Sequence, residues 1–90
     1  MRSSARNLEF EPEAFEDVAW WIEHDPRKTR RILSLLREIQ RTPFQGTGKP
    51  EPLRGNLSGA WSRRIDREHR LVYRVFDEKI LILACRGHYE

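Results

Sequence analysis

The sheet of this protein is specified chiefly by one segment of its sequence, Trp61-Ser-Arg-Arg-Ile-Asp-Arg-Glu-His-Arg-Leu-Val-Tyr-Arg-Val75. Two runs rich in β-forming residues, 60–66 and 69–75, are separated by Arg67-Glu68, which predicts a β-hairpin. Because side chains alternate across a strand, one face of this hairpin would be apolar and face the rest of the core, and the other would be cationic. The apolar positions are Trp61, Ile65, Leu71, Tyr73 and Val75, and the cationic positions are Arg64, Arg70 and Arg74.

A third strand is predicted after this hairpin, over residues 80–86, beyond a turn at 76–79. Residues 80–85 are apolar at every position, which is typical of an interior strand covered on both sides, although so short a run also fits a buried helix segment. The three strands would form an antiparallel meander. Short extended stretches are further expected at residues 8–10 and 52–54.

Two amphipathic helices are predicted before the sheet, over residues 12–24 and 26–41. Each begins with a proline, Pro12 and Pro26, and proline is favoured in a first helical turn. The link between them is so short that we expect an antiparallel hairpin, with both apolar faces turned to a common partner. The expected apolar faces are Phe15, Val18, Ala19 and Ile22 in the first helix, and Ile32, Leu33, Leu35, Leu36 and Ile39 in the second.

These elements predict one α+β domain of two antiparallel helices on a twisted, mainly antiparallel sheet of four to five strands. A chain of 90 residues suits a single core. We expect the domain to span residues 8–90 and residues 1–7 to form a disordered lead. The segment 42–59 is rich in proline and glycine and reads as a long exposed loop, and such loops in small domains are usually functional.

Positive charge is concentrated after residue 26. The formal net charge is +3, but residues 1–26 hold two arginines against seven acidic residues, whereas residues 49–74 hold seven basic residues against three acidic ones. Arginine accounts for 14 of the 17 basic residues, and its planar fork suits phosphate. A polyanion is therefore a plausible partner, with a solvated surface as the simpler alternative.

Several classes of protein are excluded by the sequence. The longest apolar run has six residues, far short of a membrane helix, and no secretory signal opens the chain, so we expect a cytoplasmic protein. The single cysteine, Cys85, is expected to be a buried thiol. The histidines His24, His69 and His88 are scattered, so we expect no metal and no cofactor, and motifs for nucleophilic catalysis are missing.

A carboxylate, arginines and an imidazole remain, which suffice to cleave RNA without a metal. Glu51 lies between two prolines and is a candidate base, with a solvated loop glutamate as the alternative. Arg70, with Arg64 beside it, is a candidate phosphate clamp. His88 has the chemistry of a proton donor near neutral pH, unless it is an inert tail residue, and Tyr89 is suited to stacking on a base or to covering the sheet edge.

The chain resembles the YoeB (Txe) toxins of the RelE/ParE superfamily over nearly its whole length from Leu8. The resemblance is carried by K-P-E-P-L at 49–53, N-L-S-G-x-W-S-R-R-I at 56–65, E-H-R-L-V-Y at 68–73 and C-R-G-H-Y at 85–89. It implies a RelE-like, microbial-ribonuclease-like fold. It also implies a toxin that enters the A site of the 70S ribosome, cuts mRNA there without a metal, and is silenced by a YefM-like antitoxin. A homodimer, and operator DNA as a target of the antitoxin complex, are left open.

The same resemblance implies roles for individual residues. Glu51 matches the family's general base, Arg70 its phosphate-stabilising arginine, His88 its general acid and Tyr89 its terminal substrate-contacting tyrosine. Basic residues near the RNA or the ribosome correspond to Lys49, Arg54, Arg63 and Arg64.

This sequence departs from the family pattern at three positions. Arg54 replaces a common lysine. Gly87 replaces an aromatic residue, which predicts a more mobile tail. Glu90 adds negative charge beside His88.

The rival hypothesis is a non-enzymatic toxin of the same fold. Such a protein would either block gyrase, like ParE, or occupy the ribosome without cutting. The fold does not separate these from the nuclease. The joint presence of Glu51, Arg70 and the pair His88-Tyr89 favours the enzyme, because a pure binder has no chemical need for them.

Overall fold

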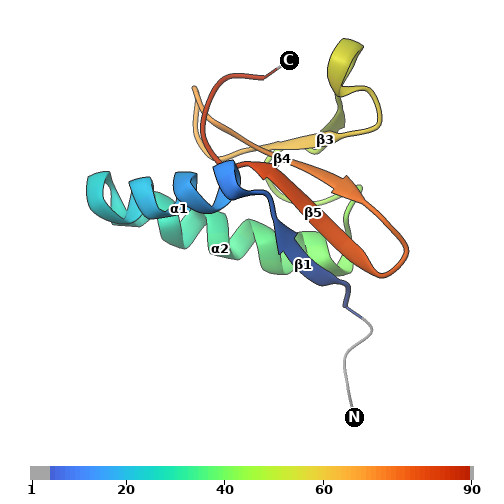
Figure 1. Cartoon of the computed structure of the whole chain (residues 1–90), viewed down its shortest axis with the longest axis horizontal. Coiled ribbons are helices and arrows are strands. Elements are labelled where there is room, and N and C mark those ends of the chain that lie inside the picture. The colour runs from blue at the N-terminus through green and yellow to red at the C-terminus, as the bar shows by residue number, and fades with distance from the viewer. Residues whose placement is uncertain (1–4, 90) are drawn as a thin grey trace.

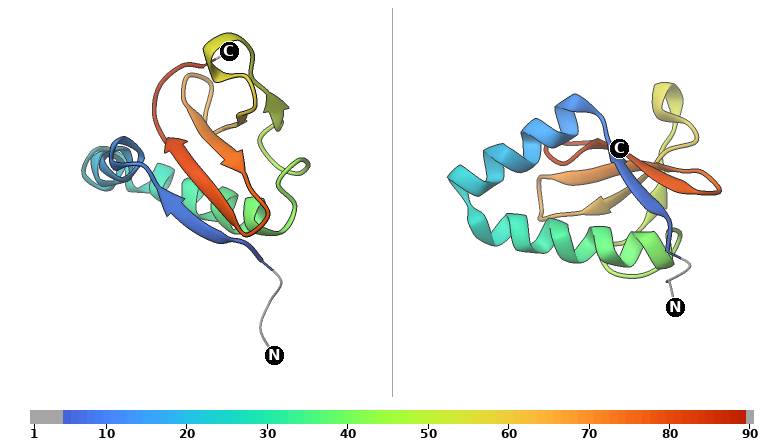
Figure 2. Two further views of the ribbon diagram at one scale, coloured as in Figure 1. Left: turned by 45° about the vertical axis from the view of Figure 1, so that its right-hand side comes forward. Right: turned by 60° about the horizontal axis from the view of Figure 1, so that its bottom comes forward.

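Two antiparallel helices and a twisted sheet form two layers in the computed structural model, which describes residues 5–89 (Figure 1). The helices cover one face of the sheet, and the segment leading to the C-terminus lies on the far side from α2 (Figure 2). The elements in chain order are β1 (Asn7–Phe10), α1 (Pro12–His24), α2 (Pro26–Arg41), β2 (Glu51–Pro52), the short 3₁₀ helix η1 (Gly55–Leu57), β3 (Trp61–Arg64), β4 (Arg70–Val75) and β5 (Lys79–Ala84).

Both helices have the predicted bounds, because their start signals are strong. Pro12 and Pro26 occupy first-turn positions, where the missing N–H needs no partner. Asp25 caps α2 by accepting a hydrogen bond from the backbone N–H of Arg27 at 3.3 Å. Asp25 also closes α1, donating its own N–H to the Trp21 carbonyl, so a single residue separates the helices. The predicted helical hairpin is confirmed, and no helix within residues 5–89 is long and apolar enough to cross a membrane.

The sheet has five strands in the order β1-β5-β4-β3-β2. Only β1 and β5 pair in parallel, and the other neighbours are antiparallel, so the predicted α+β class with a mainly antiparallel sheet is confirmed. β1 begins at Asn7, one residue before the expected domain boundary at Leu8, and Arg6 donates its backbone N–H to the Gln40 carbonyl. Residues 1–4 of the expected lead lie outside the described part of the chain.

The main core lies between the helices and the sheet, but α1 contributes a different face from the one predicted. Ala14 and Trp21 are its buried residues, whereas Phe15 and Ile22 are 63% and 55% exposed. The predicted buried face of α1 was therefore largely wrong. Phe15 and Ile22 have helical spacing, but their side chains are exposed. The predicted face of α2 is confirmed for Ile32, Leu35, Leu36 and Ile39, while Leu33 is exposed.

The sheet face turned away from the helices, here called the open face, includes Ser62, Arg64, Arg70, Val72 and Arg74. Their shared parity along β3 and β4 agrees with the prediction that these arginines project away from the helices. The open face is less purely cationic than predicted, because a second apolar cluster lies on it, formed by Leu53, Ala60, Val72 and Ala84 with Leu57, Leu83 and Tyr89 packed against them. Leu81 and Leu83 of β5 are only half-buried, so β5 is not covered equally on both sides.

Candidate functional site

Arg70 is the central residue of the open face. It begins β4 and is 8% exposed. Its Nη1 lies 3.3 Å from Oε1 of Glu51, which is a single long contact rather than a paired fork. Its buried Nε has no hydrogen-bond partner among the described residues. Arg70 therefore keeps an unused donor, which an oxygen-rich ligand is suited to fill.

Glu51 reaches Arg70 because two prolines and a short strand fix its backbone. Pro50 and Pro52 restrict the chain on either side, and Glu51 pairs with Ser62 where β2 joins β3. Since Ser62 in turn pairs with Val72, Glu51 belongs to the open face. Its side chain is 54% exposed. The carboxylate is therefore held beside Arg70 and remains accessible to a substrate.

The C-terminal tail is attached to the start of β4 by both backbone groups of Gly87. Its carbonyl accepts from the Arg70 N–H at 2.9 Å, and its N–H donates to Nδ1 of His69 at 2.9 Å. Gly87 has φ +112°, a conformation that glycine adopts readily and other residues rarely do. These two hydrogen bonds join the tail to β4, and the expectation that Gly87 makes the tail more mobile stays a prediction.

His88 and Tyr89 directly follow Gly87, whose backbone is hydrogen-bonded to that of Arg70. Nδ1 of His88 donates to the Glu68 carbonyl at 3.1 Å, and His88 is exposed. Tyr89 packs against the second apolar cluster. Partial burial raises the pKa of Tyr89, and the negative charges of Asp17 and Glu13 raise it further. Glu90 lies outside the described residues, so its expected effect on His88 stays a prediction.

Residues of α1 also hold the chain at Cys85, two residues before Gly87. The indole N–H of Trp21 donates to the Cys85 carbonyl at 2.7 Å, and Oδ2 of Asp17 accepts from the Cys85 N–H at 2.9 Å. The thiol itself is buried, and burial, with the nearby charge of Asp17, raises the pKa of Cys85 to about 12. The prediction of a buried thiol is confirmed, and such a thiol is unreactive at neutral pH.

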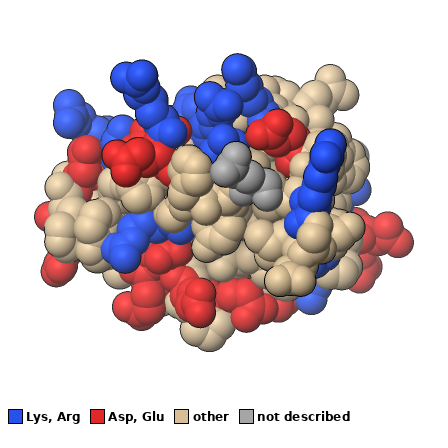
Figure 3. Space-filling model, turned by 90° about the horizontal axis from the view of Figure 1, so that it is seen from above, with Lys and Arg blue, Asp and Glu red and all other residues tan. Residues whose placement is uncertain are grey.

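Three of the four predicted RNA-binding residues lie at the surface. Arg64 pairs directly with Arg70 across β3 and β4 and is exposed, so two guanidinium groups share this end of the open face. Lys49 lies two residues before Glu51 with φ +51°, and Arg54 precedes η1, both exposed. Seen from above, basic side chains gather along one side of the molecule and acidic side chains along the other (Figure 3).

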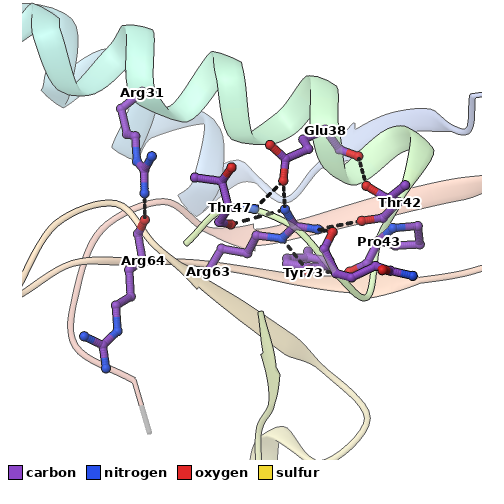
Figure 4. Close-up of polar contacts among 9 residues, drawn as sticks. Arg31, Glu38, Thr42, Pro43, Thr47, Arg63, Arg64 and Tyr73 are labelled. Carbon is purple, nitrogen blue, oxygen red and sulfur yellow. Dashed lines mark hydrogen bonds and ion pairs between the residues drawn. The ribbon is translucent and has the colours of Figure 1, made fainter. Parts of the chain in front are cut away.

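The fourth, Arg63, lies on the opposite side of the sheet, so its assignment to RNA binding needs correction. It is fully buried and points toward α2, whereas Arg64 points away from it (Figure 4). Every nitrogen of its guanidinium donates to protein oxygen. The acceptors are Glu38 Oε1 (2.6 Å), Thr42 O (2.6 Å), Gln45 O (3.0 Å), Thr47 O (3.2 Å) and the Tyr73 hydroxyl (3.2 Å).

Arg63 thus anchors the loop that precedes Glu51. Burial disfavours the charged form of Glu38, yet hydrogen bonds from Thr47 and Arg63 hold the pKa of Glu38 below its ordinary value. The Tyr73 hydroxyl donates to the Pro43 carbonyl at 2.6 Å, and desolvation raises the pKa of Tyr73. The parity of Arg63 with Trp61 in β3 was a sequence signal for this position, because it places Arg63 on the helix-facing side.

The open face combines groups suited to acid–base chemistry on a phosphodiester. It offers an accessible carboxylate, a nearly buried arginine with a spare donor, a second arginine beside it, and an imidazole on the anchored tail. Within residues 5–89, no three His, Cys, Asp or Glu side chains lie where they could hold a metal ion together.

Comparison with known proteins identifies close relatives. Residues 10–89 match the model of the YoeB-like toxin of bacterial type II toxin–antitoxin systems. The chain is 56% identical over 84 residues to a protein named Toxin YoeB from Mycobacterium bovis, covering 93% of this chain and 99% of that one. Two solved structures from Staphylococcus aureus are each 45% identical. The YoeB dimer has a TM-score of 0.88 (94% and 99% covered), and the YoeB–YefM heterotetramer has a TM-score of 0.84 (93% and 98% covered).

Proposed function

The chain belongs to the family of YoeB-like toxins of bacterial type II toxin–antitoxin systems, and on that premise we propose that it is a ribosome-dependent endoribonuclease. It would cut mRNA in the A site of the 70S ribosome, in the cytoplasm, and so inhibit translation. The observation that carries this proposal is the contact of Glu51 with Arg70 on the open face, with the tail that carries His88 hydrogen-bonded at Gly87 to the backbone of Arg70. A non-enzymatic blocker has no chemical use for this combination.

In the proposed reaction, three side chains act on one phosphodiester. Glu51 takes the proton from the ribose 2′-hydroxyl, whose oxygen attacks the adjacent phosphorus. The guanidinium groups of Arg70 and Arg64 stabilise the charge that develops on the phosphate. The P–O5′ bond then breaks, and His88 donates a proton to the leaving 5′-oxygen. The products are a 2′,3′-cyclic phosphate, or the 3′-phosphate formed by its hydrolysis, and a 5′-hydroxyl.

The geometry supports particular details of this scheme. The spare Nε donor of Arg70 suits a phosphate oxygen, and the single long contact with Glu51 would be exchanged for substrate contacts. Because a carbonyl only accepts, Nδ1 of His88 carries a hydrogen in its contact with Glu68, so we assign proton donation to Nε2. Tyr89 would contact the RNA from the edge of the second apolar cluster, and Lys49 and Arg54 would bind backbone phosphate.

A YefM-like antitoxin is the proposed inhibitor, since a relative from S. aureus forms such a complex. An acidic segment would cover Arg70 and His88, and the complex would bind operator DNA. A second copy of the chain is a further proposed partner, as in the S. aureus dimer. Purified antitoxin that binds this chain and leaves its cutting of mRNA unchanged would contradict the first assignment.

The test is primer extension on an mRNA in a reconstituted translation system. Wild type should produce a break at the A-site codon, and His88→Ala should not. Arg70→Ala should reduce the cutting rate about 10²- to 10³-fold, the usual effect of losing one charge-stabilising donor. Arg74→Ala is the matched control, because Arg74 lies on the same strand and face four residues further on. Cutting by Arg70→Ala within tenfold of wild type would remove Arg70 from the mechanism.

The rival class predicts a different first effect in cells. A gyrase blocker stops DNA supercoiling before amino-acid incorporation falls, and the proposed nuclease does the reverse. A protein that binds ribosomes and leaves every mRNA intact would support the ribosome-binding alternative.

A further inference from the structure

Ser62 is a buried polar residue of the open face with no partner in the free fold. It lies two residues before Arg64 in β3, so its side chain projects to the side of the sheet that Arg64 takes, away from α2 (Figure 4). Ser62 is 0% exposed, and its hydroxyl has no hydrogen-bond partner among the described residues. Burying an unpaired hydroxyl costs free energy, and most buried polar side chains are paired. Packing of the free protein therefore gives no reason for a hydroxyl at this position.

The sheet register places Ser62 between Glu51 and Arg70. Ser62 pairs with Glu51 of β2 on one side and with Val72 of β4 on the other. Arg70 is two residues before Val72 in β4, so it lies diagonally from Ser62. Because β3 lies between β2 and β4, the contact of Glu51 with Arg70 crosses β3 beside Ser62. Directly opposite residues have Cβ atoms about 4.5–5.5 Å apart, so the Glu51 carboxylate can reach the Ser62 hydroxyl.

Among the neighbours of Ser62 on this face of β2, β3 and β4, only Glu51 has a side chain that accepts a hydrogen bond. The others are Arg64, Arg70, Val72 and Arg74. An arginine side chain only donates, and a valine side chain does neither. The carboxylate opposite Ser62 is therefore the natural acceptor for its hydroxyl hydrogen.

We propose that Ser62 is a positioning residue for the general base, and that its hydroxyl donates a hydrogen bond to the Glu51 carboxylate when RNA occupies the open face. The proposal rests on the proposed function. In the free protein, the long contact with Nη1 of Arg70 holds Glu51. When Arg70 turns to the phosphate, this contact is lost, and Ser62 is the donor opposite Glu51. It then holds one carboxylate oxygen and leaves the other to take the proton of the 2′-hydroxyl.

This role predicts that stability and activity respond in opposite ways to the loss of the hydroxyl. Ser62→Ala removes an unpaired buried polar group from the free protein, so the urea midpoint should stay the same or rise. The same change removes the donor that Glu51 needs during cutting, so activity should fall. A residue with only a structural role would lose stability together with activity.

Single-turnover cutting of mRNA on saturating ribosomes measures the loss of activity. Ser62→Ala should cut about 10- to 100-fold more slowly than wild type, the effect of one hydrogen bond to a charged group, while its affinity for the ribosome stays the same. Ser62→Cys keeps a weaker donor and should cut at a rate between the two. Ser34→Ala is the matched control, because it makes the same change at an exposed serine of α2, and it should cut like wild type.

A double-mutant cycle tests whether Ser62 acts through Glu51. In a Glu51→Ala chain, adding Ser62→Ala should change the residual cutting rate by less than about twofold, because the acceptor is already gone. A further loss as large as that in the wild-type background would overturn the proposal. So would a Ser62→Ala chain that cuts within about twofold of wild type, or one that unfolds at a clearly lower urea concentration. A wild type that does not cut contradicts the proposed function itself, whereas these outcomes in a chain that cuts remove only the role of Ser62.

Discussion

Replacing Arg63 by methionine isolates the contribution of the buried guanidinium to stability. Methionine keeps an unbranched apolar side chain in the same space and removes the charge and all the donors. Glu38 then loses its ion-pair partner, and three loop carbonyls lose theirs. The Tyr73 hydroxyl keeps its hydrogen bond to Pro43, so damage should be confined to the attachment of the loop.

The expected loss of stability follows from the burial of the two partners. Removing one member of a buried ion pair costs about 3–5 kcal/mol, because the other charge stays unpaired. The Glu38 side chain is 32% exposed and water can reach it, so we expect the lower end, about 3 kcal/mol. A domain of this size has about 5–15 kcal/mol in all, and a loss of about 3 kcal/mol lowers Tm by about 12–24 °C.

Urea unfolding followed by circular dichroism measures this loss directly. Arg64→Met is the matched control, because the neighbouring residue is an exposed arginine on the same strand, and we expect it to change stability by less than about 0.5 kcal/mol. A double-mutant cycle with Glu38→Gln should give a coupling of at least about 1 kcal/mol between Glu38 and Arg63. If Arg63→Met lost less than about 1 kcal/mol, the reasoning from burial would be refuted.

Three further predictions concern the tail, the carboxylates and the thiol. His69→Leu removes the acceptor for the Gly87 N–H, so it should reduce mRNA cutting and expose the tail to carboxypeptidase. His69→Asn, whose Oδ1 can accept the same hydrogen bond, should restore mRNA cutting and the protection of the tail. Equal behaviour of the two variants would exclude a role of His69 in holding the tail. Lowering the pH from 5 to 3 should lower the urea midpoint. Burial raises the pKa of Glu38 and of Asp66, but hydrogen bonds to both carboxylates outweigh it, so their pKa values lie below the ordinary 4.5 and 3.8. As the pH falls, these two carboxylates therefore take up protons in the unfolded chain before they do so in the folded protein. The stabilisation is lost as the pH falls through the lower pKa values of the folded protein. Cys85 should react with a thiol reagent only after unfolding at pH 8, since its pKa is about 12, and rapid reaction of the native protein would contradict that value.

The sequence predicted helix bounds better than helix faces. Pro12, Asp25 and Pro26 are local signals whose effect does not depend on the rest of the fold, and both helices begin and end as predicted. The buried face of α1 depends on what packs against it. Phe15 and Ile22 satisfy helical spacing as well as Ala14 and Trp21 do, and packing against α2 and the sheet buries the second pair.

The open face could be predicted only in part, because some of its features follow from local sequence and others depend on distant parts of the chain. Strand parity correctly placed Arg64 and Arg70 together, because alternation is a local property. The contact between Glu51 and Arg70 depends on the path of the loop 42–50, which no pattern in the sequence specifies. Arg63 was assigned to RNA binding by the family resemblance, and its burial depends on Glu38, which is distant in the sequence.

The order of strands in the sheet has a consequence for the route of folding. β5 lies between β1 and β4, so β1 cannot join the sheet until β5 has been synthesised. Its pairing with β1 joins Leu8 to Ile80, a separation of 72 residues, and such distant contacts form slowly. We expect a chain truncated after Val75 to remain sensitive to protease, and resistance would show that the helices fold on β3 and β4 alone. A cell that makes this protein therefore has an interval, lasting until β5 has been made and paired, in which the chain exists but the tail that follows β5 is not yet attached to β4.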